Sequence, residues 1–160
     1  MVESDLPILA ICVLRNDELG IKGIVKFTQT GEVTKIECEV NGLKTGTHGF
    51  HIHEFGNLSN ACITAGAHYN PFGKTHGGPA DEERHVGDLG NLVADENGYA
   101  KFELEDKLIK LSGPYSVIGR SIICHEGEDD LGRGGFEDSK TTGHAGARLC
   151  CGIIGVTNSF

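Results

Sequence analysis

Tryptophan is absent from this chain of 160 residues, methionine occurs once, and proline occurs four times. Long apolar runs are also missing, since no stretch approaches the roughly 18 to 20 residues that a membrane-spanning helix needs. Residues 7–14 are apolar, but this segment is short, and residues 1–5 contain no basic side chain. That pattern predicts a strand rather than a secretory signal peptide. We therefore expect a cytoplasmic protein without a membrane partner, formed by one domain over residues 1–160.

Positive charge is scarce, with 14 basic against 23 acidic residues and a formal net charge of −9. Nucleic acids and anionic membranes repel such a protein, so this charge argues against both as partners. It does not exclude an anionic substrate, because the local potential at the entrance of a site governs the approach of small ions.

Cysteine pairs with CxxC spacing are missing, so the sequence does not predict a zinc–thiolate site. The six cysteines are Cys12, Cys38, Cys62, Cys124, Cys150 and Cys151. In a reducing compartment most of them are expected to be buried thiols. Three of them (Cys12, Cys38 and Cys124) occupy apolar positions of predicted strands, which agrees with that expectation.

Glycine is abundant, with 24 residues, about twice its usual frequency. Turn signals such as Asn41-Gly42 separate segments in which apolar and polar residues alternate, as they do in strands with one buried face. The predicted strands cover residues 8–15, 23–28, 34–40, 47–55, 87–94, 100–105, 117–125 and 148–156, with a short segment at 108–111. No segment has a convincing helical pattern. We predict an all-β domain, an antiparallel sandwich or flattened barrel of about eight strands.

Two long segments, residues 57–84 and 126–147, interrupt the alternation and are rich in glycine. Loops of this length without periodicity are uncommon inside a compact domain and need a functional explanation. His68 and His76 lie in the first segment, and His85 and Asp88 follow it directly. Coordination bonds to a metal ion would replace the core that this segment lacks.

Gly49–Gly56 carries His51 and His53, two residues apart in a predicted strand. Side chains at i and i+2 of a strand point to the same face, so both imidazoles converge on one point. Alone, this pair could be a coincidence on an exposed face. Together with the four residues above and His125, it makes six histidines and one carboxylate, too many for one metal ion and suited to two. His48 and His144 are expected to be ordinary polar residues.

The loop set His68, His76, His85 and Asp88 resembles a closed zinc site, because three imidazoles and a carboxylate leave no place for water. The remaining histidines His51, His53 and His125 form an all-nitrogen set. Imidazole-rich ligation suits copper, which cycles between two oxidation states.

Longer motifs surround these residues. They are Gly49–Gly56 (GFHIHEFG), Ala67–Pro71 (AHYNP), His76–Pro79 (HGGP), Asp81–Gly90 (DEERHVGDLG), His125-Glu126, Asp129–Gly132 (DDLG) and Gly146–Leu149 (GARL). With them the chain resembles the copper/zinc superoxide dismutases over nearly its full length. The resemblance implies an eight-stranded antiparallel Greek-key barrel or sandwich with two long functional loops. It also implies the disproportionation of superoxide to oxygen and hydrogen peroxide.

Carried over by position, the resemblance implies one copper ion and one zinc ion per subunit. The copper ligands would be His51, His53, His68 and His125, and the zinc ligands His68, His76, His85 and Asp88. His68 would bridge both metals and take up a proton during the reaction. Asp129 would link the copper ligand His51 to the zinc ligand His76, which fixes the tautomers of both rings.

Arg148 matches the arginine beside the open copper face of the family, where a guanidinium binds and orients a small anion. Lys140, Lys74 and Arg148 would supply the local positive field, and Glu137, Asp138 and Thr142 would shape its edge. One position departs from the family, which carries a lysine where this chain has Thr141. Lys140 would then act from one position earlier.

The resemblance further implies a disulfide between Cys62 and Cys151, although the adjacent Cys150 leaves mispairing open. In the chain-entropy model this bridge contributes roughly 4 to 5 kcal/mol. A homodimer with a contact near Gly56, Ile118, Gly119 and Ile153 is implied, as is a copper chaperone as a transient partner.

Two other functions compete with the enzyme. A metal-buffering or copper-delivery protein on the same fold would lack a copper ligand or the arginine, and both are present here. A purely structural zinc-stabilised sandwich would leave His51, His53 and His125 without a purpose. The enzyme is therefore the preferred prediction.

Overall fold

Alternating residues build the strands at the places that the sequence predicts. In β3 (Val33–Asn41) the side chains of Thr34, Ile36, Cys38 and Val40 are buried, whereas the residues between them are partly or fully exposed. A strand with this pattern places one face on a core and the other in water.

The computed structural model describes residues 6–160. The other strands are β1 (Ile8–Asn16), β2 (Ile21–Thr30), β4 (Gly46–His53), β5 (Ser59–Cys62), β6 (Asp88–Ala94), β7 (Ala100–Asp106), β8 (Ser121–His125) and β9 (Arg148–Thr157). One 3₁₀ turn, η2 (Ile63–Ala65), follows β5. The prediction against a signal peptide rests partly on residues 1–5, which lie outside the described residues. In the described part, no helix is long and apolar enough to cross a membrane.

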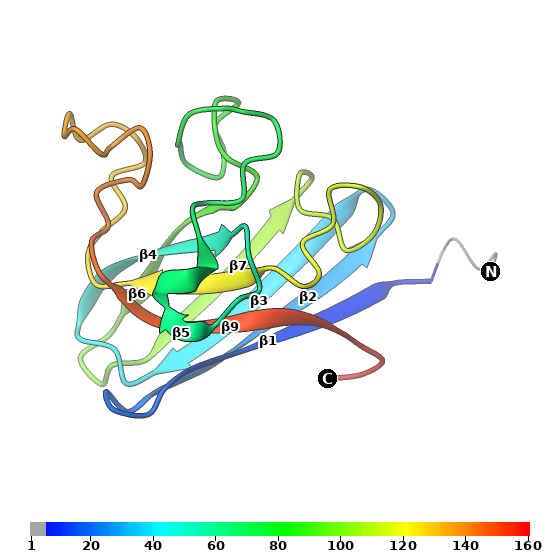
Figure 1. The fold of residues 1–160 in the computed structure, drawn as a ribbon. Coiled ribbons are helices and arrows are strands. Elements are labelled where there is room, and N and C mark those ends of the chain that lie inside the picture. Colours follow the sequence, from blue (N-terminus) through cyan, green and yellow to red (C-terminus); the bar gives the residue numbers. More distant parts are fainter. Residues whose placement is uncertain (1–5) are drawn as a thin grey trace.

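Eight strands close into an antiparallel barrel in the order β1-β2-β3-β7-β6-β4-β8-β9, and β9 pairs with β1. The chain passes from β3 to β4 without pairing them, and β7 returns to lie beside β3. Figure 1 shows the two long loops, green and orange, above the barrel. The all-β Greek-key prediction is therefore confirmed.

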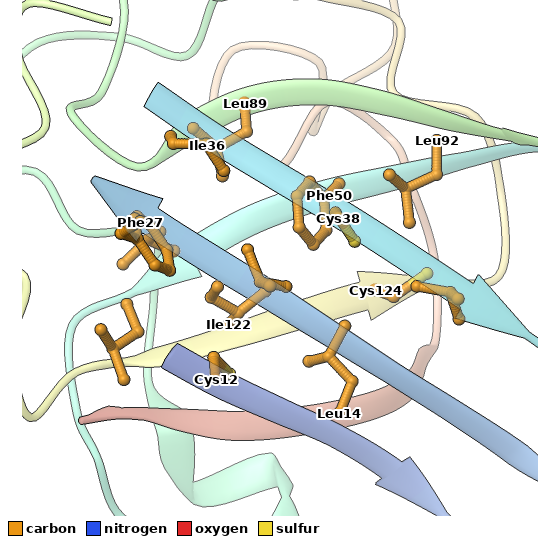
Figure 2. Close-up of a cluster of buried hydrophobic side chains, with 14 of the residues drawn as sticks. Cys12, Leu14, Phe27, Ile36, Cys38, Phe50, Leu89, Leu92, Ile122 and Cys124 are labelled. Carbon is orange, nitrogen blue, oxygen red and sulfur yellow. The ribbon is translucent and has the colours of Figure 1, made fainter. Parts of the chain in front are cut away.

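The barrel is filled by inward-facing apolar side chains from all eight strands. Phe27, Leu14, Ile36, Leu89 and Ile122 are all fully buried there (Figure 2). The ring of Phe50 meets that of Phe102 edge to face, with 5.5 Å between centroids. This core fixes β4 between β6 and β8, and so fixes the strand that carries two histidines.

The predicted strand over 117–125 begins only at Ser121. Before it, the amide of Val117 donates to the carbonyl of Lys110, and Gly119 has a φ of 83° that a strand does not allow. Residues 108–111 form no strand either, because Asp106 Oδ1 accepts hydrogen bonds from the amides of Leu108 and Ile109.

The segment 57–84 is not without structure, since it contains β5 and η2. β5 has only four residues, too few to show periodicity in the sequence. Tertiary contacts hold it, since it lies against β9 and ends at the disulfide Cys62–Cys151.

The disulfide pairs the cysteines that the family resemblance implies, with 5.8 Å between their Cα atoms. Cys150 is fully buried and lies opposite Cys124 in the register of β8 and β9. Because neighbours in a strand point to opposite faces, Cys150 faces the barrel core and Cys151 faces β5. Cys150 is thus a buried thiol, as are Cys12, Cys38 and Cys124.

The substitution Cys151→Ala should remove about 4 to 5 kcal/mol from the unfolding free energy, because the disulfide closes a loop with a sequence separation of 89. The adjacent control Cys150→Ala should cost on the order of 1 kcal/mol, since only packing is lost. Urea unfolding of the metal-free protein measures both. Equal losses in the two variants would contradict this account.

Candidate metal centre

The strand β4 delivers His51 and His53 to one buried point at the base of the long loops. Both side chains are almost completely buried. His125, at the end of β8, reaches the same point because β8 pairs with β4. The first long loop folds back over β4, where His68 forms a β-bridge with His53. Residues distant in sequence thus meet at one place.

Four of these histidines form a compact donor group. One ring nitrogen from each of His51, His53, His68 and His125 lies within 4.8 Å of the other three. The Nε2 atoms of His53 and His125 are 3.4 Å apart. The structure therefore brings together the four residues predicted to bind copper.

A second group contains His68, His76, Asp88 and, again, His51. It differs from the predicted zinc set, which has His85 in place of His51. His85 is nevertheless close, since its Nδ1 lies 3.1 Å from His68 Nδ1 and 3.3 Å from Asp88 Oδ1. The other oxygen of Asp88 accepts hydrogen bonds from the amides of Gly77 and His85, which anchors the loop.

In two rings of the first donor group, one nitrogen donates a hydrogen bond, which leaves the other nitrogen free to bind a metal. His53 Nδ1 donates to the carbonyl of Gly66 (2.8 Å), and His125 Nδ1 donates to that of Gly146 (3.1 Å). Each ring then presents an unprotonated Nε2 to the centre of the group.

Three buried nitrogens have no hydrogen-bond partner among the described residues: His51 Nδ1, His68 Nε2 and His76 Nδ1. His76 Nδ1 lies 2.8 Å from Asp88 Oδ1 without forming a hydrogen bond. Buried polar atoms are normally satisfied, so orphan nitrogens aimed into both groups indicate bound cations. The donor sets thus fit copper, with four imidazoles, and zinc, with imidazoles and a carboxylate.

The protonation states also suit metal binding. Burial lowers the pKa of His51, His53 and His68, and it lowers the pKa of His125 to about 4. These rings are therefore neutral at physiological pH, which is the form that donates a lone pair to a metal.

Negative charge gathers at the second donor group. Burial alone would raise the pKa of Asp88, but contacts with His68, His76 and His85 hold that pKa well below its usual range. Burial likewise opposes protonation of His76, yet the carboxylates of Asp129 and Asp88 raise its pKa to about 9. An ionised carboxylate amid these rings favours a divalent cation.

Asp129 connects the two groups. Its fully buried carboxylate accepts hydrogen bonds from His51 Nε2 (2.6 Å) and His76 Nε2 (2.7 Å). Asn91 holds Asp129 through two further bonds to its backbone. Because Asp129 accepts the Nε2–H of both rings, Nδ1 is the atom of each ring that can bind a metal. The raised pKa of His76 means that metal binding there would displace a proton from Nδ1. Sequence reasoning missed Asn91, which no local motif marks.

Arg148 lies beside the first donor group, which contains His53 and His125. Its guanidinium donates to the carbonyl oxygens of Cys62 (2.8 Å) and Gly66 (2.7 Å). Its positive charge helps to lower the pKa of His53 and His125. The carbonyl oxygen of Gly66 thus accepts hydrogen bonds from both His53 and Arg148.

The comparison with known proteins agrees with this geometry. Residues 21–154 match the family described as "Copper/zinc superoxide dismutase (SODC)". A superoxide dismutase [Cu-Zn] of Saccharomyces cerevisiae is 54% identical over 152 residues, which cover 93% of this chain and 98% of the relative. A superoxide dismutase [Cu-Zn] of Candida albicans is 55% identical over 151 residues, which cover 92% of this chain and 97% of that relative. Superoxide dismutase [Cu-Zn] 5 of Dictyostelium discoideum is 51% identical, with the same coverage.

This chain belongs to the copper/zinc superoxide dismutase family. The cofactors of the family are copper and zinc, and the two donor groups meet the requirements of both ions. The prediction made from the histidine spacing and the motifs is therefore confirmed at the level of family, enzyme class and cofactors.

The predicted steering residues lie on both long loops, with Lys74 on the first and Glu137, Asp138, Lys140 and Thr142 on the second. Hydrogen bonds from the amides of Gly78 and Thr75 lower the pKa of Asp81 and of Glu83, respectively, and the nearby charge of Lys140 lowers both further. Lys74 donates to the carbonyl of Glu82. Glu137 is exposed, and Thr142 contacts Asp138. The two lysines thus lie near acidic residues of the first long loop, and their effect on substrate approach stays a prediction.

The two histidines expected to be ordinary polar residues lie outside both donor groups. His48 is buried, and its ring nitrogens contact the carbonyl oxygens of His125 and Lys44. His144 is exposed and pairs with Asp138 at 2.6 Å.

We expect Asp129→Asn to reduce the affinity for bound metal by about 10- to 100-fold. An amide offers one acceptor oxygen, so its NH₂ group would meet the N–H of either His51 or His76. Competition with a chelator, followed by metal analysis of the protein, measures the change. Asp138→Asn, an exposed carboxylate on the same loop, is the matched control. If the two variants retain the same amount of metal, the linking role of Asp129 is refuted.

Proposed function

We propose that this protein disproportionates superoxide, with His51, His53, His68 and His125 binding copper and His68, His76, His85 and Asp88 binding zinc. The reaction consumes two superoxide anions and two protons and yields oxygen and hydrogen peroxide. The observation that carries this proposal is the pair of adjacent donor groups, which have His51 and His68 in common. When bound, copper supplies one-electron oxidation and reduction, and zinc supplies fixed positive charge and support for the shared ring.

His68 is the residue that we expect to serve both groups. Its Nδ1 lies 2.9 Å from Asp88 Oδ1, whereas its buried Nε2 lacks a hydrogen-bond partner. The ring of His51 lies against it at a tilt of 30°, with 4.0 Å between centroids. Held from the Asp88 side, His68 can release and carry a proton at Nε2 without leaving its place. Proton delivery to a reduced oxygen species requires such a positioned group.

Arg148 is proposed to bind the superoxide anion beside the copper histidines. Its hydrogen bonds to the carbonyls of Cys62 and Gly66 fix the planar guanidinium. A fixed cation of this kind orients a small anion and attracts it from solution. Lys140, with Glu137, Asp138 and Thr142 nearby, is proposed to shape the local field at the second long loop.

The decay rate of superoxide, normalised to bound copper and measured at several ionic strengths, tests the function. Fast decay that slows with rising salt is expected, because screening weakens the attraction of the anion to local positive charge. With copper confirmed to be bound, no acceleration over buffer would overturn the proposal and favour a metal-buffering protein.

Arg148→Ile should lower the rate at low ionic strength by at least about tenfold and weaken its dependence on salt. Arg148→Lys keeps the charge but not the planar fork, so an intermediate rate is expected. Copper analysis of each variant confirms that metal content is unchanged. A rate equal to that of the unmodified protein in Arg148→Ile would contradict the proposed role.

We also propose a homodimer. Large exposed apolar side chains gather around β1 and β9, among them Val13, Phe55, Ile153 and Val156. A groove on this face is lined by Ile11, Leu58 and the disulfide. Gly56 lies against the backbone of Gly119, close to Ile153. An apolar face of this kind is typical of protein interfaces. A copper chaperone and a cytoplasmic location are proposed from the family resemblance alone.

Ile153→Glu should convert a dimer of the 17.1 kDa chain into monomers, because a buried unpaired charge opposes association. Sedimentation equilibrium measures the mass. Val93→Glu, at an exposed apolar position of β6, serves as the control and should stay dimeric. A monomeric unmodified protein would overturn the proposed homodimer.

A further inference from the structure

Three backbone hydrogen bonds form a closed triangle beside the metal centre. Ile52 donates to Gly87 (2.9 Å), Gly87 donates to Tyr69 (3.1 Å), and Tyr69 donates to Ile52 (2.8 Å). Each corner is a chain neighbour of a proposed ligand. Ile52 lies between His51 and His53, Tyr69 follows His68, and Gly87 precedes Asp88. The triangle therefore ties β4 to both ends of the segment 68–88, which supplies the proposed zinc ligands.

Gly87 permits this close approach. A methyl group at this position would overlap the carbonyl oxygen of Ile52. Glycine is thus required for contact of the backbones rather than for an unusual turn. The three segments cannot separate without breaking hydrogen bonds of buried groups, since Ile52, Tyr69 and Gly87 are all buried.

One side-chain pair includes a corner of the triangle. The guanidinium of Arg120 lies over the buried ring of Tyr69, 3.8 Å from its centroid. The same guanidinium donates to the carbonyl of Glu54 (2.8 Å) and to that of Ser116 (3.1 Å). The amide of Glu54 in turn donates to the carbonyl of Ala67 (2.9 Å).

These contacts act on two ligands at once. Glu54 follows His53 in the chain, and Ala67 and Tyr69 flank His68. A stacked cation in a partly desolvated place is held more firmly than an exposed one. By fixing the peptide after His53 and the side chain after His68, Arg120 limits movement of the two rings relative to each other.

We propose that Arg120 and Tyr69 are positioning residues that fix the ring of His68 relative to that of His53, and with it the spacing of the two donor groups. The pair touches neither metal nor substrate and acts through the backbone of the ligands. This inference rests on the proposed ligand assignment. Because metal–ligand distances tolerate only about 0.2 Å of change, loss of the pair should be detectable at the metals.

The test uses Tyr69→Leu and Arg120→Met, which remove the ring and the guanidinium. Two readouts are the zinc release rate into a chromogenic chelator and the electron paramagnetic resonance spectrum of bound Cu²⁺. Zinc release at least about tenfold faster, with a changed copper hyperfine splitting, is expected in both variants. Thermal unfolding of the metal-free forms separately reports on the barrel.

Three controls make the result specific. Tyr69→Phe keeps the ring beneath the guanidinium and removes only the hydroxyl, so this variant should have the unmodified spectrum. Arg120→Lys keeps the charge without the planar guanidinium, so its zinc release rate and copper spectrum should lie between those of the unmodified protein and Arg120→Met. It replaces Arg120→Met in the test if that variant does not fold. Phe160→Leu removes the partner of another cation–aromatic pair, with Lys26, and should change neither readout.

The outcomes separate the possibilities. Lower stability of the metal-free variants, with unchanged zinc release and an unchanged copper spectrum, would show a merely structural role and overturn the inference. An unmodified protein that fails to bind both metals would overturn the proposed function and this inference together. Altered release and spectrum in Tyr69→Leu and Arg120→Met, with Tyr69→Phe and Phe160→Leu unchanged, would support it.

Discussion

Burial of imidazole nitrogens without hydrogen-bond partners is the constraint on which the rest of this structure depends. His51, His68 and His76 each bury one such nitrogen. An unsatisfied buried polar atom costs on the order of 1 to 3 kcal/mol, so a fold that accumulates several of them in one place needs cations to complete it. The long loops, which lack periodicity, fold around this centre rather than around an apolar core of their own.

A surrounding layer of acceptors decides which nitrogen of each ring faces a metal. Asp129 accepts hydrogen bonds from Nε2 of His51 and His76. The carbonyl oxygens of Gly66 and Gly146 accept hydrogen bonds from Nδ1 of His53 and His125, respectively. The tautomer of each ring is thus set by its partner. The carbonyl of Gly66 also holds Arg148, so the proposed copper ligand and the proposed substrate-binding group share one support.

Much of the fold and site follows from local patterns. Period-two alternation located the strands because each pairs one apolar face with the barrel core, and His51 and His53 share a face for the same geometric reason. The pattern failed at Val117, where a turn bonded to Lys110 delays β8 until Ser121. It also failed at β5, whose four residues are held by contact with β9 and by the disulfide.

The sequence by itself determined an all-β chain with two long loops, the identity of the metal-binding residue types, and the family. These follow from side-chain chemistry and from spacing along one strand or motif. Only the tertiary structure decided that Cys150 faces the core, that His85 lies at the edge of the second donor group, and that Arg120 stacks on Tyr69. Each of these depends on segments far apart in the chain, whose relative placement is set by barrel closure and burial and not by any local pattern.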